Sequence, residues 1–217
     1  MSETPPPNPG AKADAKADAR RRQILDAARA CVLNAGFHSS SMQQIAHAAD
    51  LSVGQIYRYF DNKEAIIAAL AAEDFADKKA RFAALDTREV PLMHALLKQC
   101  AEAVDRATQA DRAAVFLEVV AEAARNTKIH AVLKAADGEE LALHRSMLRL
   151  ACPADVSDAE IEARAEVFAA LFDGIAMRAV IRPISEPGRP DRIALLQTLR
   201  PIVEGLLSGP SLISETR

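Results

Sequence analysis

Residues 40–63 read SSMQQIAHAADLSVGQIYRYFDNK and contain three potential helix starts. At each start a Ser or Asp precedes a Gln or Glu by three residues; the pairs are Ser41 with Gln44, Ser52 with Gln55, and Asp61 with Glu64. Such a pair forms a capping box, in which each side chain accepts a hydrogen bond from the backbone amide of the other residue. Starts this close together predict two short helices, over about 41–49 and 52–60, before a longer one.

The apolar positions of this segment fit two short helices that pack against each other. One face of the first carries Met42, Ile45, Ala46 and Ala49, and Ile56 and Phe60 continue that face on the second. Asp50 occupies the turn, where the backbone commonly needs the left-handed region that Asp tolerates better than most residues. This arrangement is a helix-turn-helix, whose second helix enters the major groove of DNA.

The polar residues around the second helix form a candidate DNA-binding face. Its members are Arg21, Arg22, Ser40, Ser41, Ser52, Val53, Gly54, Gln55, Tyr57, Arg58, Tyr59 and Lys63. Gln55 and Arg58 are the side chains best suited to pair with base edges. The serines at 40 and 41, both tyrosines and Lys63 are predicted to bind phosphate. Ser52 and Val53 could contact base edges or thymine methyls, Gly54 permits close approach, and Tyr57 could instead be a core aromatic.

The segment from about residue 20 to 70 resembles the N-terminal domain of the TetR family of bacterial transcriptional regulators. The resemblance rests on ILDAARACVLNAGF (24–37) and SMQQIAHAADLSVGQIYRYFDNKEAIIAAL (41–70), and Asp50 is the main departure from the family pattern. It implies an all-α protein with an N-terminal three-helix helix-turn-helix domain. It also implies a C-terminal helical bundle that binds a ligand and dimerises.

Composition agrees with a helical DNA-binding protein. Half of the 217 residues are hydrophobic and Trp is absent, which favours a large helical core. The net charge of −3 conceals a division, because residues 20–63 carry six basic and three acidic side chains, whereas the remainder from residue 64 carries 19 basic and 24 acidic ones. A positive segment on an acidic body fits a local DNA-binding surface.

We divide the chain into a disordered tail (1–19), a helix-turn-helix domain (20–66) and a helical effector-binding and dimerisation domain (67–217). The second half of the tail could instead extend the first helix, predicted over about 20–35 with Gly36 as its left-handed cap. The tail is either solvated or an arm whose basic residues touch DNA. Beyond it the sequence predicts helices over about 62–84, 90–108, 111–126, 128–151, 158–181 and 191–208, with a cap at Ser157.

The last two predicted helices carry more apolar surface than one face requires. One stripe can face the chain's own core, and the other needs a partner. The predicted dimer interface comprises Phe168, Leu171, Phe172, Leu195, Leu199, Ile202, Val203 and Leu206. Burial within a single chain is the alternative, whereas the resemblance implies a two-fold four-helix bundle.

The resemblance also implies a ligand cavity in the body, although the motif does not specify its lining. Polar or soft residues on otherwise apolar helices are the candidates: His94, Arg112, Phe116, His144, Met147, Asp173 and Met177. Each of them could equally be structural or solvent-facing.

The sequence predicts no cofactor, no metal site and no catalytic residues. Its five histidines lack metal-ligand spacing, and neither a Gly-rich phosphate loop nor a Gly-x-Ser-x-Gly motif occurs. The three cysteines are interpreted as reduced core thiols, with a redox-sensor role as the alternative. No signal peptide or membrane span is recognisable, so we expect a soluble, cytoplasmic protein.

Together these features predict a ligand-responsive repressor that binds a palindromic DNA operator as a homodimer. Its partners would be double-stranded DNA, a second copy of the chain and an unknown small-molecule effector, with no membrane. Two alternatives remain: a DNA-binding regulator without an effector, and a helical enzyme or carrier with a vestigial DNA-binding head.

Overall fold

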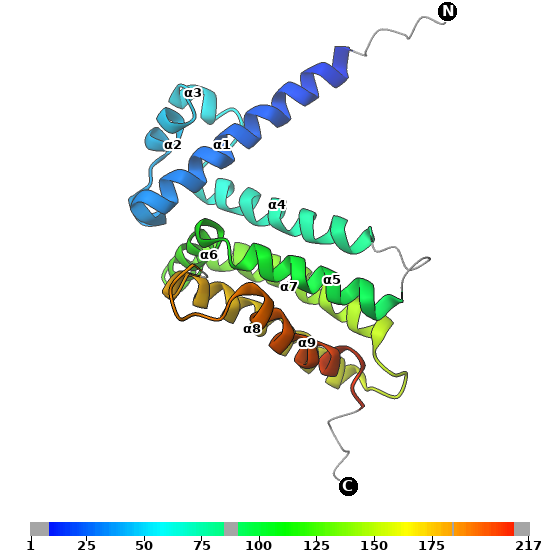
Figure 1. The fold of residues 1–217 in the computed structure, drawn as a ribbon. Helices are drawn as coiled ribbons and strands as arrows, with labels where there is room; N and C mark the ends of the chain where they lie inside the picture. The colour runs from blue at the N-terminus through cyan, green and yellow to red at the C-terminus, as the bar shows by residue number, and fades with distance from the viewer. Residues whose placement is uncertain (1–8, 85–90, 184, 211–217) are drawn as a thin grey trace, which may run out of the picture.

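The computed structural model of the chain describes residues 9–84, 91–183 and 185–210 (Figure 1). These residues form helices α1 (Pro9–Ser39), α2 (Met42–Ala48), α3 (Val53–Ile56), α4 (Lys63–Ala83), α5 (Leu92–Ala107), α6 (Ala110–Ala123), α7 (Thr127–Ala151), α8 (Asp158–Ile181) and α9 (Arg192–Ser208). The described ranges contain no strand. The all-α prediction is therefore confirmed, and α7 runs unbroken through Asp137 and Gly138.

The helices form a head and a body, which Figure 1 shows one above the other. The head comprises α1–α3 and the start of α4. Its core includes Ile24, Ile45, Ile56 and Ile66, none more than 2% exposed. Val119 of α6 and Ile129 of α7 belong to the same core. The head is therefore continuous with the body at these two helices.

Helix α1 is longer than predicted. It begins at Pro9, so residues 9–19 are helical, which agrees with the alternative in which the second half of the tail extends the first helix; residues 1–8 lie outside the described ranges. The Ala-rich sequence explains this, because Ala has the highest helix propensity and Pro fits the first helical position. Gly36 adopts the predicted positive φ of 75°, but its ψ of 161° is extended, and helical turns resume after it.

The turn residues largely follow the sequence prediction. Asp50 has φ 52°, in the left-handed region as expected. The predicted cap at Asp61 is wrong, because the Asn62 side chain accepts from the Ala65 amide at 2.8 Å. Asn is as good a cap as Asp, so α4 begins one residue later than the Asp61 pair would place it.

The body packs α5, α7, α8 and α9 around a second core that includes Leu96, Leu148, Val203 and Leu207. A buried ion pair joins Arg164 to Glu160 at 2.6 Å. The Arg164 guanidinium also donates to the carbonyls of Leu206 at 3.0 Å and Pro210 at 2.7 Å. Arg164 thereby fixes the end of α9 to α8. No helix in the described part of the chain is long and apolar enough to span a bilayer.

Candidate nucleic-acid interface and ligand cavity

Two capping boxes hold the helix-turn-helix in place. Ser41 Oγ accepts from the Gln44 amide at 3.2 Å, and Gln44 Oε1 accepts from the Ser41 amide at 2.8 Å. Ser52 and Gln55 repeat the pattern at 3.2 and 2.9 Å. Both boxes are confirmed as predicted. Because Gln55 Oε1 accepts this hydrogen bond from the Ser52 amide, the side-chain nitrogen of Gln55 is the group available to donate to a base.

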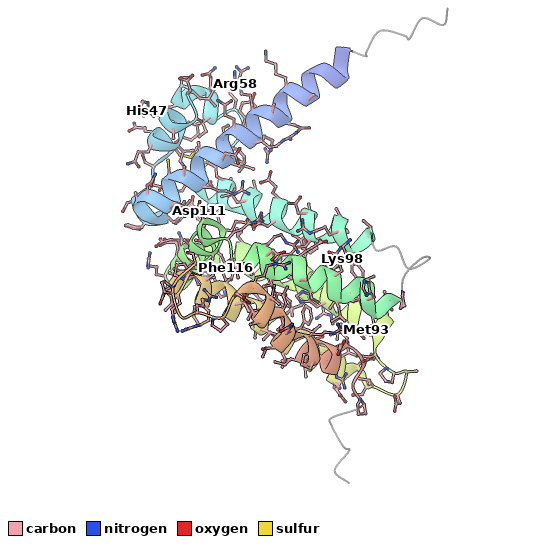
Figure 2. All side chains as sticks on the ribbon, viewed as in Figure 1. His47, Arg58, Met93, Lys98, Asp111 and Phe116 are labelled. Carbon is pink, nitrogen blue, oxygen red and sulfur yellow. The ribbon has the colours of Figure 1, made fainter. Side chains whose placement is uncertain are left out.

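Most of the predicted DNA-binding residues are accessible on the head. Arg21, Arg22, Ser41, Ser52, Gly54, Gln55, Tyr57 and Arg58 are exposed, whereas Val53, Tyr59 and Lys63 are half-buried. Figure 2 places Arg58 on the side of the head that faces away from the body. Tyr57 is 50% exposed, so the alternative of a core aromatic is wrong. Arg21 stacks on Phe60, with its guanidinium carbon 4.5 Å from the ring centroid, and donates to the Tyr59 carbonyl at 3.2 Å.

Two predicted phosphate-binding residues are directed elsewhere. Lys63 Nζ donates to the carbonyls of Phe37, His38 and Ser40 at 2.9, 3.0 and 3.0 Å. An ammonium has three donors, so Lys63 caps the end of α1 and presents none of them to DNA. Ser40 is only 3% exposed, and its hydroxyl donates to the Gly36 carbonyl at 2.8 Å. Carbonyls at a helix end require such donors.

The body contains a cavity of about 230 Å³ between α4, α5, α6, α7 and α8. Five of the predicted ligand-binding residues line it, namely Arg112, Phe116, His144, Met147 and Asp173. His94 instead lines a hollow between α5 and α9, and Met177 lies on the outer side of α8 with 45% of its surface exposed. Met177 follows the cavity residue Ala176 and is turned about 100° around the helix from it.

Several charged cavity residues were missed by sequence reasoning. They are Asp74, Lys78 and Arg81 on α4, Arg106 on α5 and Glu140 on α7. Lys78 Nζ donates to both carboxylate oxygens of Glu140 at 2.6 Å, and Arg112 pairs with Asp74. For the three residues on α4, the spacing in the sequence could have indicated a shared location, because positions 74, 78 and 81 lie on one helical face with Phe82.

His144 is the most unusual polar group in the cavity. Its ring meets Phe168 edge-on, with centroids 4.9 Å apart and planes at 64°. Nδ1 is buried without a hydrogen-bond partner, and Nε2 lies 3.8 Å from Glu140. Burial lowers the pKa of His144 despite the attraction of Glu140. The ring is therefore neutral near physiological pH and has an unused hydrogen-bonding atom.

Other shifted groups show how burial acts on the cavity. Partial burial and the nearby Glu140 carboxylate raise the pKa of Asp173, which sits at the exposed edge. Burial, followed by repulsion from Arg81, lowers the pKa of Arg106. Burial raises the pKa of the Cys100 thiol to about 12, so this cysteine remains a neutral thiol. That protonation state disfavours a redox-sensor role for Cys100.

The apolar surface of α8 and α9 differs from the predicted dimer interface. Phe168, Leu199 and Val203 are buried in the chain's own core, and Phe172 lines the cavity. Leu171, Leu195 and Leu206 are half-buried, and Ile202 is 49% exposed. The outward surface also includes five residues that were not predicted for the interface: Val167, Met177, Val180, Ile181 and Ile193. Both stripes are apolar, so periodicity could not decide which one faces out.

The described residues contain no group of three or more His, Cys, Asp or Glu side chains placed to hold a metal ion. The cavity is instead a mixture of paired charges, arginines and apolar side chains. Such a lining suits reversible binding of a small molecule.

Two parts of the chain match known families. Residues 24–70 match the bacterial regulatory proteins of the tetR family, and residues 92–208 match the C-terminal domain of BetI-type transcriptional repressors. The transcriptional regulator UidR of Escherichia coli is 32% identical over 120 residues, which cover 55% of this chain and 59% of UidR. The aligned part thus spans less than two thirds of that relative.

Solved structures agree over a greater length. Salmonella enterica GusR has 28% identity and a TM-score of 0.70, covering 87% of this chain and 95% of its own. The fatty acid degradation regulator FadR from Bacillus halodurans has a TM-score of 0.71 at 20% identity, covering 86% of this chain and 95% of its own; at that identity it supports the fold alone. Since the C-terminal match covers more than half of the chain and the helix-turn-helix lies where the N-terminal match requires, the chain belongs to the TetR family of bacterial transcriptional regulators.

Proposed function

We propose that the chain is a repressor that binds a palindromic operator as a homodimer and is released by a small molecule bound in the body. One observation carries this proposal: α6 contacts both the cavity and the head. Arg112 and Phe116 line the cavity. Glu118, two residues further and therefore about 200° around the helix, contacts α1 on the opposite face. Figure 2 shows Phe116 at the end of the body nearest the head.

The contact between α6 and α1 is close and polar. Glu118 Oε2 accepts from the Phe37 amide at 3.3 Å and lies 3.0 Å from the position that a Cβ on residue 36 would take. Phe37 is itself stacked under Lys63, whose Nζ lies 4.4 Å from the ring centroid. A displacement of α6 would therefore act on the junction from which α2 and α3 emerge.

Helix α4 supplies a second link between the two regions. Ile66, Ile67 and Leu70 lie in the core of the head. Further along the same helix, Asp74, Lys78, Arg81 and Phe82 line the cavity. A ligand that binds one arrangement of α4 and α6 better than another shifts the population toward it. In a dimer, that shift would move the recognition helices away from the spacing of about 34–36 Å that successive major grooves require.

The outward surface of α8 and α9 supports the homodimer. Val167, Met177, Ile181 and Ile202 are between 45% and 57% exposed. An apolar surface of this kind is typical of a protein interface, and two-fold pairing would cover both copies at once.

The test begins with the full-length chain and fragmented genomic DNA. Bound fragments are selected and sequenced, and affinity is then measured by fluorescence anisotropy at several salt concentrations. We expect a shared palindromic site, a linear fall of log affinity with log salt, and a dimer by light scattering. A monomer in solution, or equal affinity for all fragments, would contradict the proposal.

A further inference from the structure

Resting on the proposed function, we propose that the effector is a small amphipathic anion. Its acid group would bind between Arg81 and Arg106, and its apolar or aromatic part would lie beside Phe168 and Phe172. The cavity lining combines arginines on α4, α5 and α6, here called the cationic wall, with apolar and aromatic side chains on α7 and α8. Together they define this class of ligand.

The cationic wall contains three arginines: Arg81 on α4, Arg106 on α5 and Arg112 on α6. Arg112 is paired with Asp74. The ion pairs between described residues leave Arg81 and Arg106 without a carboxylate partner, and Arg81 Nε is buried with no hydrogen-bond partner. A buried donor without a partner is costly, so an anion placed here would remove that cost.

The electrostatic surroundings also favour an anion at this wall. Arg81 and Arg112 repel Arg106, whereas Glu102 and Asp77 attract it, and the pKa of Arg106 is lowered overall with burial as the first cause. The attraction of Glu102 and Asp77 therefore raises the pKa of Arg106 by less than burial and repulsion lower it. Guanidinium groups bind carboxylate or phosphate through two parallel hydrogen bonds.

The part of the cavity lined by α7 and α8 is largely apolar and aromatic. Phe168 and Phe172 of α8 have ring centroids 4.9 Å apart, tilted by 40°, and Leu143 and Met147 of α7 line the same cavity. His144 adds a neutral ring with a free Nδ1. Two carboxylates are carried by the same helices: Glu140, which is paired with Lys78, and Asp173. Asp173 would repel an acid group and favour its binding at the arginines.

The size of the cavity restricts the ligand further. Its volume of about 230 Å³ lies below the range of about 300–1,000 Å³ for drug-sized ligands. We therefore expect a single ring or a short chain bearing one acid group.

Calorimetry with the full-length protein and matched pairs of probes tests the ligand class. The acids are benzoate, phenylacetate, hexanoate and phenyl phosphate, and the neutral counterparts of the first three are benzamide, phenylacetamide and hexanamide. We expect at least one carboxylate to bind about tenfold more tightly than its amide, because charged hydrogen bonds are lost in the amide. The phosphate distinguishes between the two kinds of acid. Equal binding of acid and amide, or no binding of any acid at millimolar concentration, would overturn the proposal.

Variants assign the effect to the cationic wall. Arg106→Gln should weaken the acid about tenfold and leave its amide unchanged. Lys134→Gln is the matched control, since it removes one positive charge from an exposed position of α7 and should change neither. Arg81→Gln repeats the test if the first variant does not fold, as judged by circular dichroism. Retention of the acid preference in every folded arginine variant would contradict the assignment.

The same probes separate this inference from the proposed function. If an acid binds at the arginines without altering DNA affinity, the proposed ligand class is supported, but the proposed release of DNA by a ligand in the cavity is wrong. If a neutral compound binds the cavity and releases DNA whereas no acid does, regulation of DNA binding through the cavity is supported, but the proposal that the effector is an anion is wrong.

Discussion

The head and the cavity of this chain are both built from helices, but the capping pairs of the helix-turn-helix and the ion pairs of the cavity join residues at very different separations along the sequence. In the head, Ser41 and Ser52 each pair with a residue only three positions away. Around the cavity, Lys78 reaches Glu140 across 62 positions and Arg112 reaches Asp74 across 38. Local pairing sets the starts of α2 and α3, whereas the cavity depends on how several helices are placed together.

The most disruptive change should be in the body, where Arg164 holds α9 through long-range contacts. Arg164→Ala should lower the free energy of unfolding by about 3–5 kcal/mol, because it breaks a buried ion pair. The control Arg145→Ala removes an exposed arginine paired with Glu162 at 2.7 Å and should cost less than about 1 kcal/mol. Urea denaturation would show both effects, and similar losses in the two variants would show that Arg164 is no special anchor.

The junction between the two regions should be the next most sensitive site. Gly36→Ala forces a Cβ into a positive φ and within 3.0 Å of Glu118 Oε2, so we expect a loss of about 1–3 kcal/mol. Gly138→Ala is the control, because its Cβ would meet open space in the middle of α7. That change should stabilise by about 0.5–1 kcal/mol. Equal melting temperatures for the two variants would contradict this view of the junction.

Lys63 distinguishes local support of the head from contact with DNA. Lys63→Ala should lower stability by about 1–2 kcal/mol, because the end of α1 loses its capping charge. The salt dependence of DNA binding should stay unchanged, whereas Arg22→Ala should reduce that slope by about 1 if Arg22 binds phosphate. Thermal melts and anisotropy titrations measure the two quantities. If Lys63→Ala reduces the salt dependence of DNA binding without lowering stability, Lys63 binds DNA phosphate and does not cap α1.

The smallest expected effect concerns pH and the cavity. The pKa of His144 is lower in the folded protein than in the unfolded chain, so the unfolded state takes up the proton first as the pH falls. The stability that comes from this pKa difference is fully present above about pH 6.5, the pKa of an unfolded histidine. It is lost as the pH falls from there to the lower pKa of the folded state. His144→Gln should make the melting temperature fall less steeply in that window. The remaining four histidines are exposed, and His130→Gln serves as the control.

The sequence predicted the features that depend on neighbouring residues. The boxes at Ser41 and Ser52, the positive φ of Asp50 and the limits of the body helices all follow from local chemistry. The role of Lys63 could not be predicted, because its three carbonyl partners lie 23 to 26 positions earlier in the chain.

The cavity and the dimer surface also show that features formed by distant residues could not be predicted from the sequence. Arg112, Phe116 and Met147 were proposed for their chemistry, but only the packing of five helices brings them to one cavity. Leu199 and Val203 were assigned to a partner, although they face the core. Their helix is apolar on two sides, and hydrophobicity alone does not identify the side that is already covered.

Coupling between the cavity and the head is tested most directly by the DNA affinity of Glu118→Gln with and without the acid that releases the unmodified protein. In the unmodified protein the acid should weaken DNA binding by about 5- to 150-fold. In Glu118→Gln this ratio should approach one, while each ligand alone binds as before, and Glu139→Gln, an exposed change on α7, should keep the full ratio. An undiminished ratio in Glu118→Gln would contradict transmission through α6.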